Sequence, residues 1–172
     1  MVGCTANVAL VVKDEFIVAN VGDTRCLLSS KGKVIEMSED HKPELEREKK
    51  RIEEAGGEVI SGRINGNLNI SRALGDFPLK NNTALRQEEQ MLIAVPEIKK
   101  RKLTSDDEFI IILCDGVWEC MSNQELIDFV GEKINKISPM SKIVEKLFDK
   151  IIAPEKGSKF YDIMKCYKSH DH

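Results

Sequence analysis

The apolar residues in the first part of the chain occur in short runs separated by turn residues. The runs cover residues 6–12, 16–21, 25–29 and 34–37. Asp14-Glu15, Gly22-Asp23 and Lys31-Gly32-Lys33 separate them. Short runs with such short connections are typical of strands paired in antiparallel hairpins. The run Ala6–Val12 is almost continuously apolar, which predicts a buried strand.

A charged segment with very few apolar residues follows at Glu44–Ala55. Pro43 is suited to the first turn of a helix, and Gly56-Gly57 is suited to its end. Because the apolar stripe is thin, we expect this helix to lie on the surface and to bury little. A short strand is predicted at 58–64, followed by an irregular loop over 65–76.

The second half of the chain changes from extended segments to helices. Extended elements are expected at 92–95, 97–101 and 109–114. The six consecutive apolar residues of the last element predict a strand that is buried on both faces. Strands followed by helices indicate an α+β fold with mostly antiparallel sheets.

Two helices are predicted after this strand. Ser122 with Glu125 forms a capping box at the start of the first helix. Ser138-Pro139 opens the second helix, and Pro154 ends it. Residues 155–172 are charged and lack apolar periodicity, so we expect a divergent tail there.

Composition and charge exclude several classes of function. The net charge is -3, with 26 basic and 29 acidic side chains well mixed, so no strong field attracts nucleic acid or an anionic membrane. The apolar runs are too short to span a bilayer, and the first residues do not resemble a signal peptide. The five cysteines form no CxxC pair. We therefore expect free thiols in a reducing compartment, the cytoplasm or the nucleus.

Three carboxylates stand where the strand pattern ends. Asp115 directly follows the apolar run at 109–114 and precedes Gly116, and Asp23 has a similar setting after Gly22. Glu119 lies four residues after Asp115, so a helical turn would bring both carboxylates to one side. Local pattern alone also fits plain turn or capping roles for these acids.

The supply of ligand residues points to a hard cation. Carboxylates favour Mg²⁺ or Mn²⁺, whereas zinc prefers His and Cys. His41 is isolated, and the other two histidines lie at 170 and 172, so no His-Cys spacing for zinc occurs. A nucleophilic Cys114 is disfavoured because the neighbouring carboxylate raises a thiol pKa. An aspartyl-phosphate mechanism is disfavoured because position 117, where a second acid would be needed, is Val.

Seven segments in order resemble the metal-dependent protein serine/threonine phosphatases of type 2C, the PPM family. They are GCTA at Gly3–Ala6, ANVGDTR at Ala19–Arg25, DHKP at Asp40–Pro43, the Glu46–Val59 segment ending in AGGEV, SRALGD at Ser71–Asp76, Pro96-Glu97, and DEFIIILCDGVWE at Asp107–Glu119. Each motif is weak by itself, whereas the ordered set covering residues 3 to about 154 is specific.

The resemblance implies part of a four-layer α-β-β-α sandwich with mostly antiparallel sheets. It implies a domain over residues 1–154, in which 44–69 forms a flap-like segment. It also implies Mg²⁺ or Mn²⁺ and the hydrolysis of phosphoserine and phosphothreonine in proteins by a metal-activated water.

The resemblance also assigns roles to individual residues. Asp115 would be a ligand of the central metal pair, and Asp23, Asp115 and Glu119 would surround a third metal. The family commonly has Asp where this chain has Glu119, so the reach is one methylene longer. Arg72 and Asp76 are expected to organise the region rather than to perform chemistry.

Two family motifs do not occur in the chain. A DGHGG-type motif is expected before Gly3, and a GCDNMT-type motif is expected after the helix that ends near Ala153. We therefore expect the chain to be catalytically incomplete and inactive alone. The alternative is a non-catalytic, phosphatase-like module that binds or regulates partners. In both cases we expect a monomer that does not bind nucleic acid or membranes.

Overall fold

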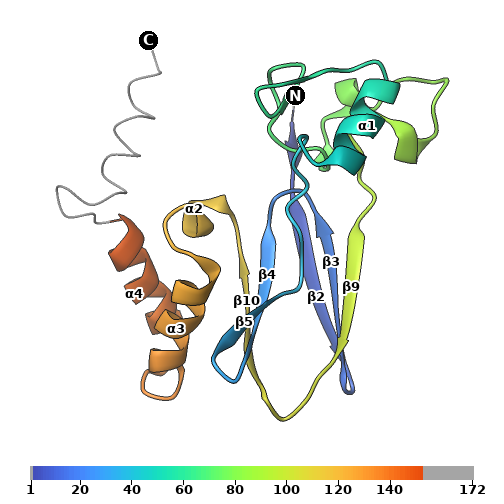
Figure 1. The fold of residues 1–172 in the computed structure, drawn as a ribbon. Helices are drawn as coiled ribbons and strands as arrows, with labels where there is room; N and C mark the ends of the chain where they lie inside the picture. Colours follow the sequence, from blue (N-terminus) through green and yellow to red (C-terminus); the bar gives the residue numbers. More distant parts are fainter. Residues whose placement is uncertain (1, 153–172) are drawn as a thin grey trace. The chain divides into compact units, whose positions relative to one another are not determined.

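The computed structural model describes residues 2–152 of the chain (Figure 1). Within these residues the chain forms two compact units. The first contains 2–31 and Ile35–Asp115, and the second contains Gly32–Val34 and 116–152. The predicted domain over 1–154 remains a prediction, and both the expected tail at 155–172 and Pro154 lie outside the described residues.

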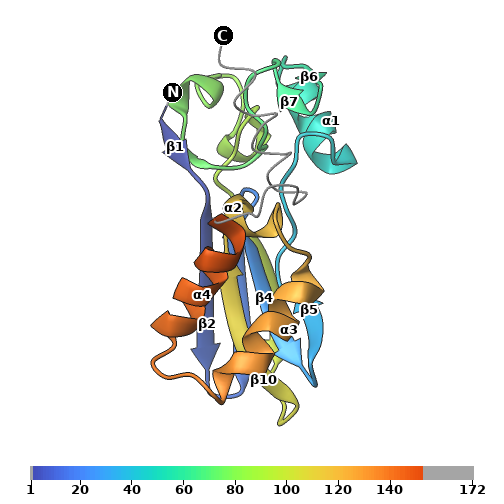
Figure 2. The same cartoon turned by 90° about the vertical axis from the view of Figure 1, so that its left-hand side faces the viewer.

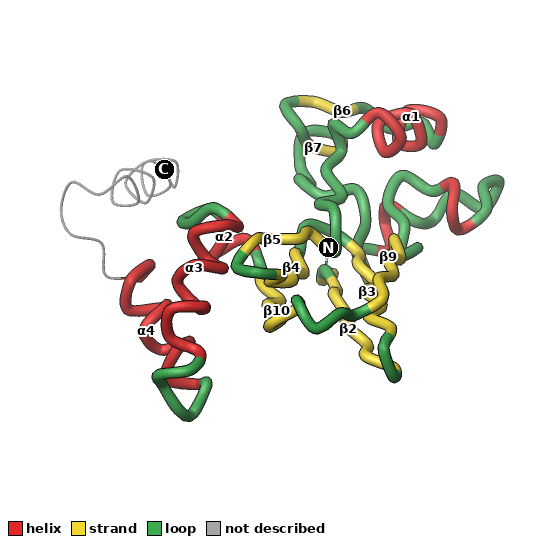
Figure 3. Tube along the Cα trace, turned by 60° about the horizontal axis from the view of Figure 1, so that its bottom comes forward, coloured by secondary structure: helices red, strands yellow, loops and turns green. Residues whose placement is uncertain are grey.

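The longer strands form two antiparallel sheets of three strands each (Figure 3). One has the order β2-β3-β9, with β2 at Ala6–Val12, β3 at Glu15–Val21 and β9 at Glu97–Lys102. The other has the order β10-β4-β5, with β10 at Asp107–Leu113, β4 at Arg25–Ser30 and β5 at Lys33–Glu36. The predicted α+β class with antiparallel sheets is confirmed.

A compact apolar core joins the two sheets. Phe16 and Val18 of β3 pack in one cluster with Cys26 and Leu28 of β4, and Met37 completes it. Phe16, Val18 and Cys26 have no exposed surface. Since β3 and β4 belong to different sheets, the sheets pack face to face through this cluster. Burial raises the pKa of Cys26 to about 11, so its thiol stays protonated and packs as an apolar group.

Two of the strands are less buried than the sequence predicts. Val8 and Leu10 of β2 are 60% and 52% exposed, so the prediction that Ala6–Val12 is buried was wrong. In β10 the side chains alternate, with Ile110 and Ile112 exposed, so this strand is not buried on both faces. An apolar run specifies a strand, but burial of each face requires another layer to cover it.

Helix α1 spans Glu46–Glu54. It begins three residues after Pro43 instead of at it, because residues 42–45 form a turn in which the Leu45 amide donates to the Lys42 carbonyl. Gly56, with φ of 85°, follows its end as predicted. The helix is not merely superficial, since Ile52 is fully buried in a second core with Ile64 and Leu92.

Short strands connect segments that are far apart in the sequence. β6 at Val59–Ile60 and β7 at Arg63–Ile64 form a hairpin within residues 44–69, for which the flap-like role stays a prediction. β1 at Gly3–Cys4 pairs with β8 at Leu74–Gly75. The element expected at 92–95 is not a strand, because Ile93 makes only an isolated bridge with Arg72. Two 3-10 turns, η1 at Phe77–Leu79 and η2 at Gln87–Glu89, lie between these elements.

Three helices follow the sheets in sequence. They are α2 at Asp115–Trp118, α3 at Asn123–Ile134 and α4 at Ser141–Ile152. The capping box of Ser122 and Glu125 at the start of α3 is confirmed. Helices α3 and α4 lie side by side (Figure 2). None of the helices in the described part of the chain has the length and apolar character to cross a membrane.

The position of the core gives a stability prediction. Phe16→Ala removes a fully buried ring, and we expect it to lower the free energy of unfolding by about 3–5 kcal/mol. The matched control is Phe77→Ala, because Phe77 is 75% exposed and its loss should change that free energy by less than about 0.5 kcal/mol. Urea unfolding followed by circular dichroism measures both. Equal losses for the two variants would contradict the assignment of the core.

Candidate functional site

Asp23 lies in a sharp turn directly after β3. Gly22, with φ of 98°, makes the turn possible, and a Cβ at this position would collide with the Thr5 side chain. The Asp23 side chain is largely buried, and Lys42 Nζ donates to its Oδ2. The turn therefore holds a carboxylate in a fixed place beside one cation.

His41 fixes this turn from the other side. Its backbone amide donates to the Gly22 carbonyl at 3.0 Å, and the Gly22 amide donates to His41 Nδ1 at 3.0 Å. An accepting Nδ1 requires a neutral ring with the proton on Nε2. Burial and then the nearby Arg72 lower the pKa of His41, which favours that neutral form. No local pattern predicts this contact, since His41 stands alone between charged residues.

The imidazole has a second nitrogen that is also buried. No hydrogen-bond partner for His41 Nε2 occurs among residues 2–152, and the nearest acid is Glu97, whose Oε2 lies 3.8 Å away. Asn20 adds two further bonds around the turn, because its Nδ2 donates to the carbonyls of Gly22 and Glu39. The Asp23 turn is therefore held by side chains from β3 and by the segment that contains DHKP.

A buried ion cluster lies next to this segment, with Glu48 of α1 at its centre. Glu48 is fully buried, and its carboxylate accepts from both Arg51 and Arg72 at 2.5 Å. The Ser71 hydroxyl donates to it at 2.9 Å. Burial alone would raise the pKa of Glu48, but the two guanidinium groups lower it to about 2. The carboxylate is therefore charged at neutral pH.

The same guanidinium groups bind backbone carbonyls from distant loops. Arg51 donates to the carbonyls of Ser71 and Gln90, at 2.7 and 3.1 Å. Arg72 donates to the carbonyl of Val95 at 3.0 Å. These contacts fit the organising role expected for Arg72. Asp76 is also buried, and its amide donates to the carbonyl of Val2, which fastens the end of SRALGD to the first strand.

Asp115 and Glu119 stand at opposite ends of the short helix α2. Asp115 is its first residue and Glu119 follows its last, and both side chains are exposed. Asp115 and Asp23 belong to the first unit, whereas Glu119 belongs to the second. The structure therefore leaves the predicted set of Asp23, Asp115 and Glu119 as a prediction.

Asp23, Asp115 and Glu119 carry carboxylates, the ligand type that a hard cation prefers. Among residues 2–152, no group of three or more His, Cys, Asp or Glu side chains could hold a metal ion. Lys42 also pairs with Asp23, and an ammonium competes with a cation for the same carboxylate. The metal dependence implied by the sequence resemblance therefore stays a prediction for this chain.

Comparisons with known sequences define the family. The family model described as "Protein phosphatase 2C" matches residues 1–159. The chain is 48% identical over 153 residues to Probable protein phosphatase 2C 21 of Arabidopsis thaliana, covering 89% of this chain and 43% of that protein. It is 51% identical over 160 residues to Protein phosphatase 1G of Bos taurus, covering 89% of this chain and 30% of that protein. The chain therefore belongs to the protein phosphatase 2C family.

Solved structures support the same fold. A crystal structure of a phosphatase from a pathogenic strain of Toxoplasma gondii superposes with a TM-score of 0.72 at 34% identity. The match covers 78% of this chain and 43% of that one. The chain thus spans less than half the length of each relative named here.

The buried carboxylate gives a pH prediction. The pKa of Glu48 is about 2 in the folded state and 4.5 in its ordinary state. Its contribution to stability is therefore complete above pH 4.5 and is lost as the pH falls through about 2, amounting to about 3 kcal/mol. Urea unfolding between pH 7 and pH 2 should show this loss in the wild-type chain.

The same pH series tests the origin of the loss. Glu48→Gln is expected to be less stable at pH 7 and to lack this part of the acid dependence. Glu53→Gln, an exposed glutamate on the same helix, is the control and should follow the wild type. A Glu48→Gln variant with the wild-type pH profile would contradict the assignment.

Proposed function

We propose that this chain forms part of a Mg²⁺- or Mn²⁺-dependent phosphatase that hydrolyses phosphoserine and phosphothreonine in proteins. The observation that carries the proposal is that three other motif segments meet around the Asp23 turn. Thr5 lies against Gly22, His41 binds Gly22, Lys42 pairs with Asp23, and Ser71 donates its amide to the His41 carbonyl. Because residues 1–159 match the protein phosphatase 2C family, we interpret the Asp23 turn as part of a phosphatase site.

The proposed role of the carboxylates is to bind metal. Asp115 would hold a cation of the central pair, with Asp23 and Glu119 toward a further one. When bound, such a cation supplies Lewis acidity and lowers the pKa of a coordinated water. The contribution of the chain itself is to hold the Asp23 carboxylate rigidly through His41 and Asn20. A rigid carboxylate loses less entropy when it binds a ligand.

We further propose that the 172 residues have no activity alone. This proposal rests on the sequence, in which the DGHGG-type and GCDNMT-type motifs of the family do not occur. The same observation favours the alternative function, a non-catalytic module that binds partners. The cytoplasmic or nuclear location and the monomeric state stay predictions.

A chimera with a relative distinguishes the two functions. Residues 1–159 would replace the matching segment of Bos taurus Protein phosphatase 1G, to which the chain is 51% identical. We expect the chimera to hydrolyse a phosphothreonine peptide only with Mn²⁺ or Mg²⁺, and Asp115→Asn to lower kcat/KM by about 100-fold or more, because a metal ligand is lost.

The control is Asp106→Asn, which removes an exposed acid that pairs with Lys31 and should leave the rate within about twofold. The chain alone should be inactive in the same assay. A folded chimera without activity would favour the non-catalytic module. A chimera that keeps its rate after Asp115→Asn would overturn the role of Asp115.

A further inference from the structure

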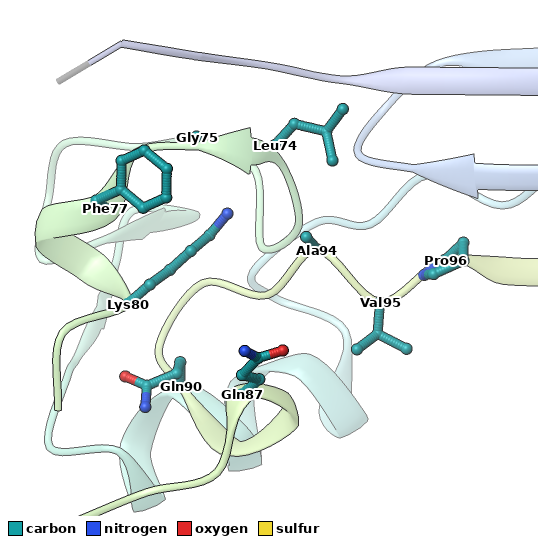
Figure 4. Close-up of a pocket in the computed structure, with 9 residues that line it drawn as sticks. All are labelled: Leu74, Gly75, Phe77, Lys80, Gln87, Gln90, Ala94, Val95 and Pro96. Atoms are coloured by element: carbon teal, nitrogen blue, oxygen red, sulfur yellow. The ribbon is translucent and has the colours of Figure 1, made fainter. Parts of the chain in front are cut away.

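A hollow of about 530 Å³ lies beside β8 in the first unit, and none of the predicted metal ligands is among the residues that line it (Figure 4). It is half open to solvent, and its surface is mainly apolar. The residues that decide its chemistry are Leu74, Phe77, Lys80, Gln87, Val95 and Pro96. Neither the buried core nor the Asp23 turn uses these side chains.

The walls of the hollow are fastened to each other by hydrogen bonds. The Ala73 amide donates to the Ile93 carbonyl at 3.0 Å, and Lys80 Nζ donates to the Ala73 carbonyl at 2.6 Å. Arg72 adds its bond to the Val95 carbonyl. These bonds join the segment at residues 72–80 to the segment at residues 93–95. A ligand would therefore meet a preformed shape and lose little binding energy to reorganisation.

The mouth of the hollow is an exposed apolar rim. Phe77 is 75% exposed, and Leu74 and Val95 are each 43% exposed. Aromatic side chains in this situation supply much of the binding energy in protein interfaces, because covering them removes a large apolar area from water. A rim of this kind around a preformed hollow is suited to a bulky apolar side chain.

The polar groups of the hollow restrict the ligand further. Lys80 is the one charged side chain among the lining residues, and its stem runs past the Phe77 ring toward Leu74 (Figure 4). An ammonium has three donors, and one of them binds Ala73. Burial lowers the pKa of Lys80, and the carboxylate of the neighbouring Asp76 offsets part of this effect. Asp76 itself does not line the hollow. An incoming anion would therefore meet a cation, and the Gln87 amide offers both a donor and an acceptor.

We propose that this hollow is a docking pocket for an extended peptide segment of a partner protein. A bulky aliphatic side chain of the peptide packs against Phe77 and Val95, and a neighbouring acidic side chain pairs with Lys80. Gln87 binds the peptide backbone. An extended peptide suits these groups, because its side chains can reach the apolar rim and Lys80 while its backbone meets the Gln87 amide. This pocket does not depend on the proposed phosphatase activity.

The test uses the 172-residue chain and three synthetic peptides, followed by amide chemical-shift changes. The first is acetyl-Gly-Ala-Leu-Glu-Ala-Gly-amide, the second has Gln for Glu, and the third has Ala for Leu. We expect the first to shift the amides of Leu74, Phe77 and Val95 and to bind more tightly than the other two. Phe77→Ala should weaken its binding by at least about fivefold. Leu10→Ala, an exposed apolar control on β2, should have no effect.

The charge is tested separately. Lys80→Met should abolish the preference for the Glu peptide over the Gln peptide, and Lys80→Arg should restore it. Lys49→Met, on the exposed face of α1, is the control. The proposal is overturned if no peptide shifts these amides at several millimolar, if the shifts map elsewhere, or if Phe77→Ala changes nothing. Tighter binding of sodium octanoate than of the first peptide would assign the pocket to a small amphiphile instead.

Discussion

The first unit depends on a single carboxylate that is placed where water cannot reach it. Burying a charge is costly unless opposite charges and hydrogen bonds compensate it. Glu48 satisfies this condition chiefly through Arg51 and Arg72, which both donate to its carboxylate, while Arg47 lies 3.3 Å from it. Each guanidinium also has N–H groups that do not bind Glu48. These groups donate to the backbone carbonyls of residues 71, 90 and 95. The need to compensate one charge thereby fixes three segments of chain around α1.

This constraint connects the Asp23 turn with the hollow beside β8. Ser71 binds both Glu48 and the backbone of His41, and His41 in turn holds the turn before Asp23. In the other direction, Arg72 fixes Val95 and therefore one wall of the hollow. The predicted metal ligand and the proposed docking pocket thus share one support. A change in the ion cluster is expected to reach both.

Local patterns predicted the elements well where local physics decides them. The β2-β3 and β4-β5 hairpins follow from short apolar runs with turn residues between them. The equally short connection between β3 and β4 was expected to form a hairpin too, but it joins two different sheets. Ser122 with Glu125 specifies the start of α3 by its own hydrogen bonds. Burial was harder to predict. The charged residues of 44–55 indicated a surface helix, because nothing near Glu48 in sequence shows that Arg72 will meet it 24 residues later.

The candidate site was predicted by resemblance more than by periodicity. Strand ends drew attention to Asp23 and Asp115, but ordinary turn residues have the same pattern. His41 looked isolated because its partner Gly22 is 19 residues away, and only folding brings the two together. The exposed faces of β2 and β10 were missed for a related reason, since burial depends on the layer that covers a strand and not on the strand itself.

Amide hydrogen exchange tests most directly whether the Glu48 cluster holds these segments in place. The comparison is between the wild-type chain and Glu48→Gln near neutral pH, read at the amides of Ser71, Ala73 and Gly22. The account predicts that all three exchange faster in the variant, while the amide of Leu28 in the sheet core keeps its protection. Unchanged protection at Ser71 and Ala73 in a folded Glu48→Gln variant would contradict it.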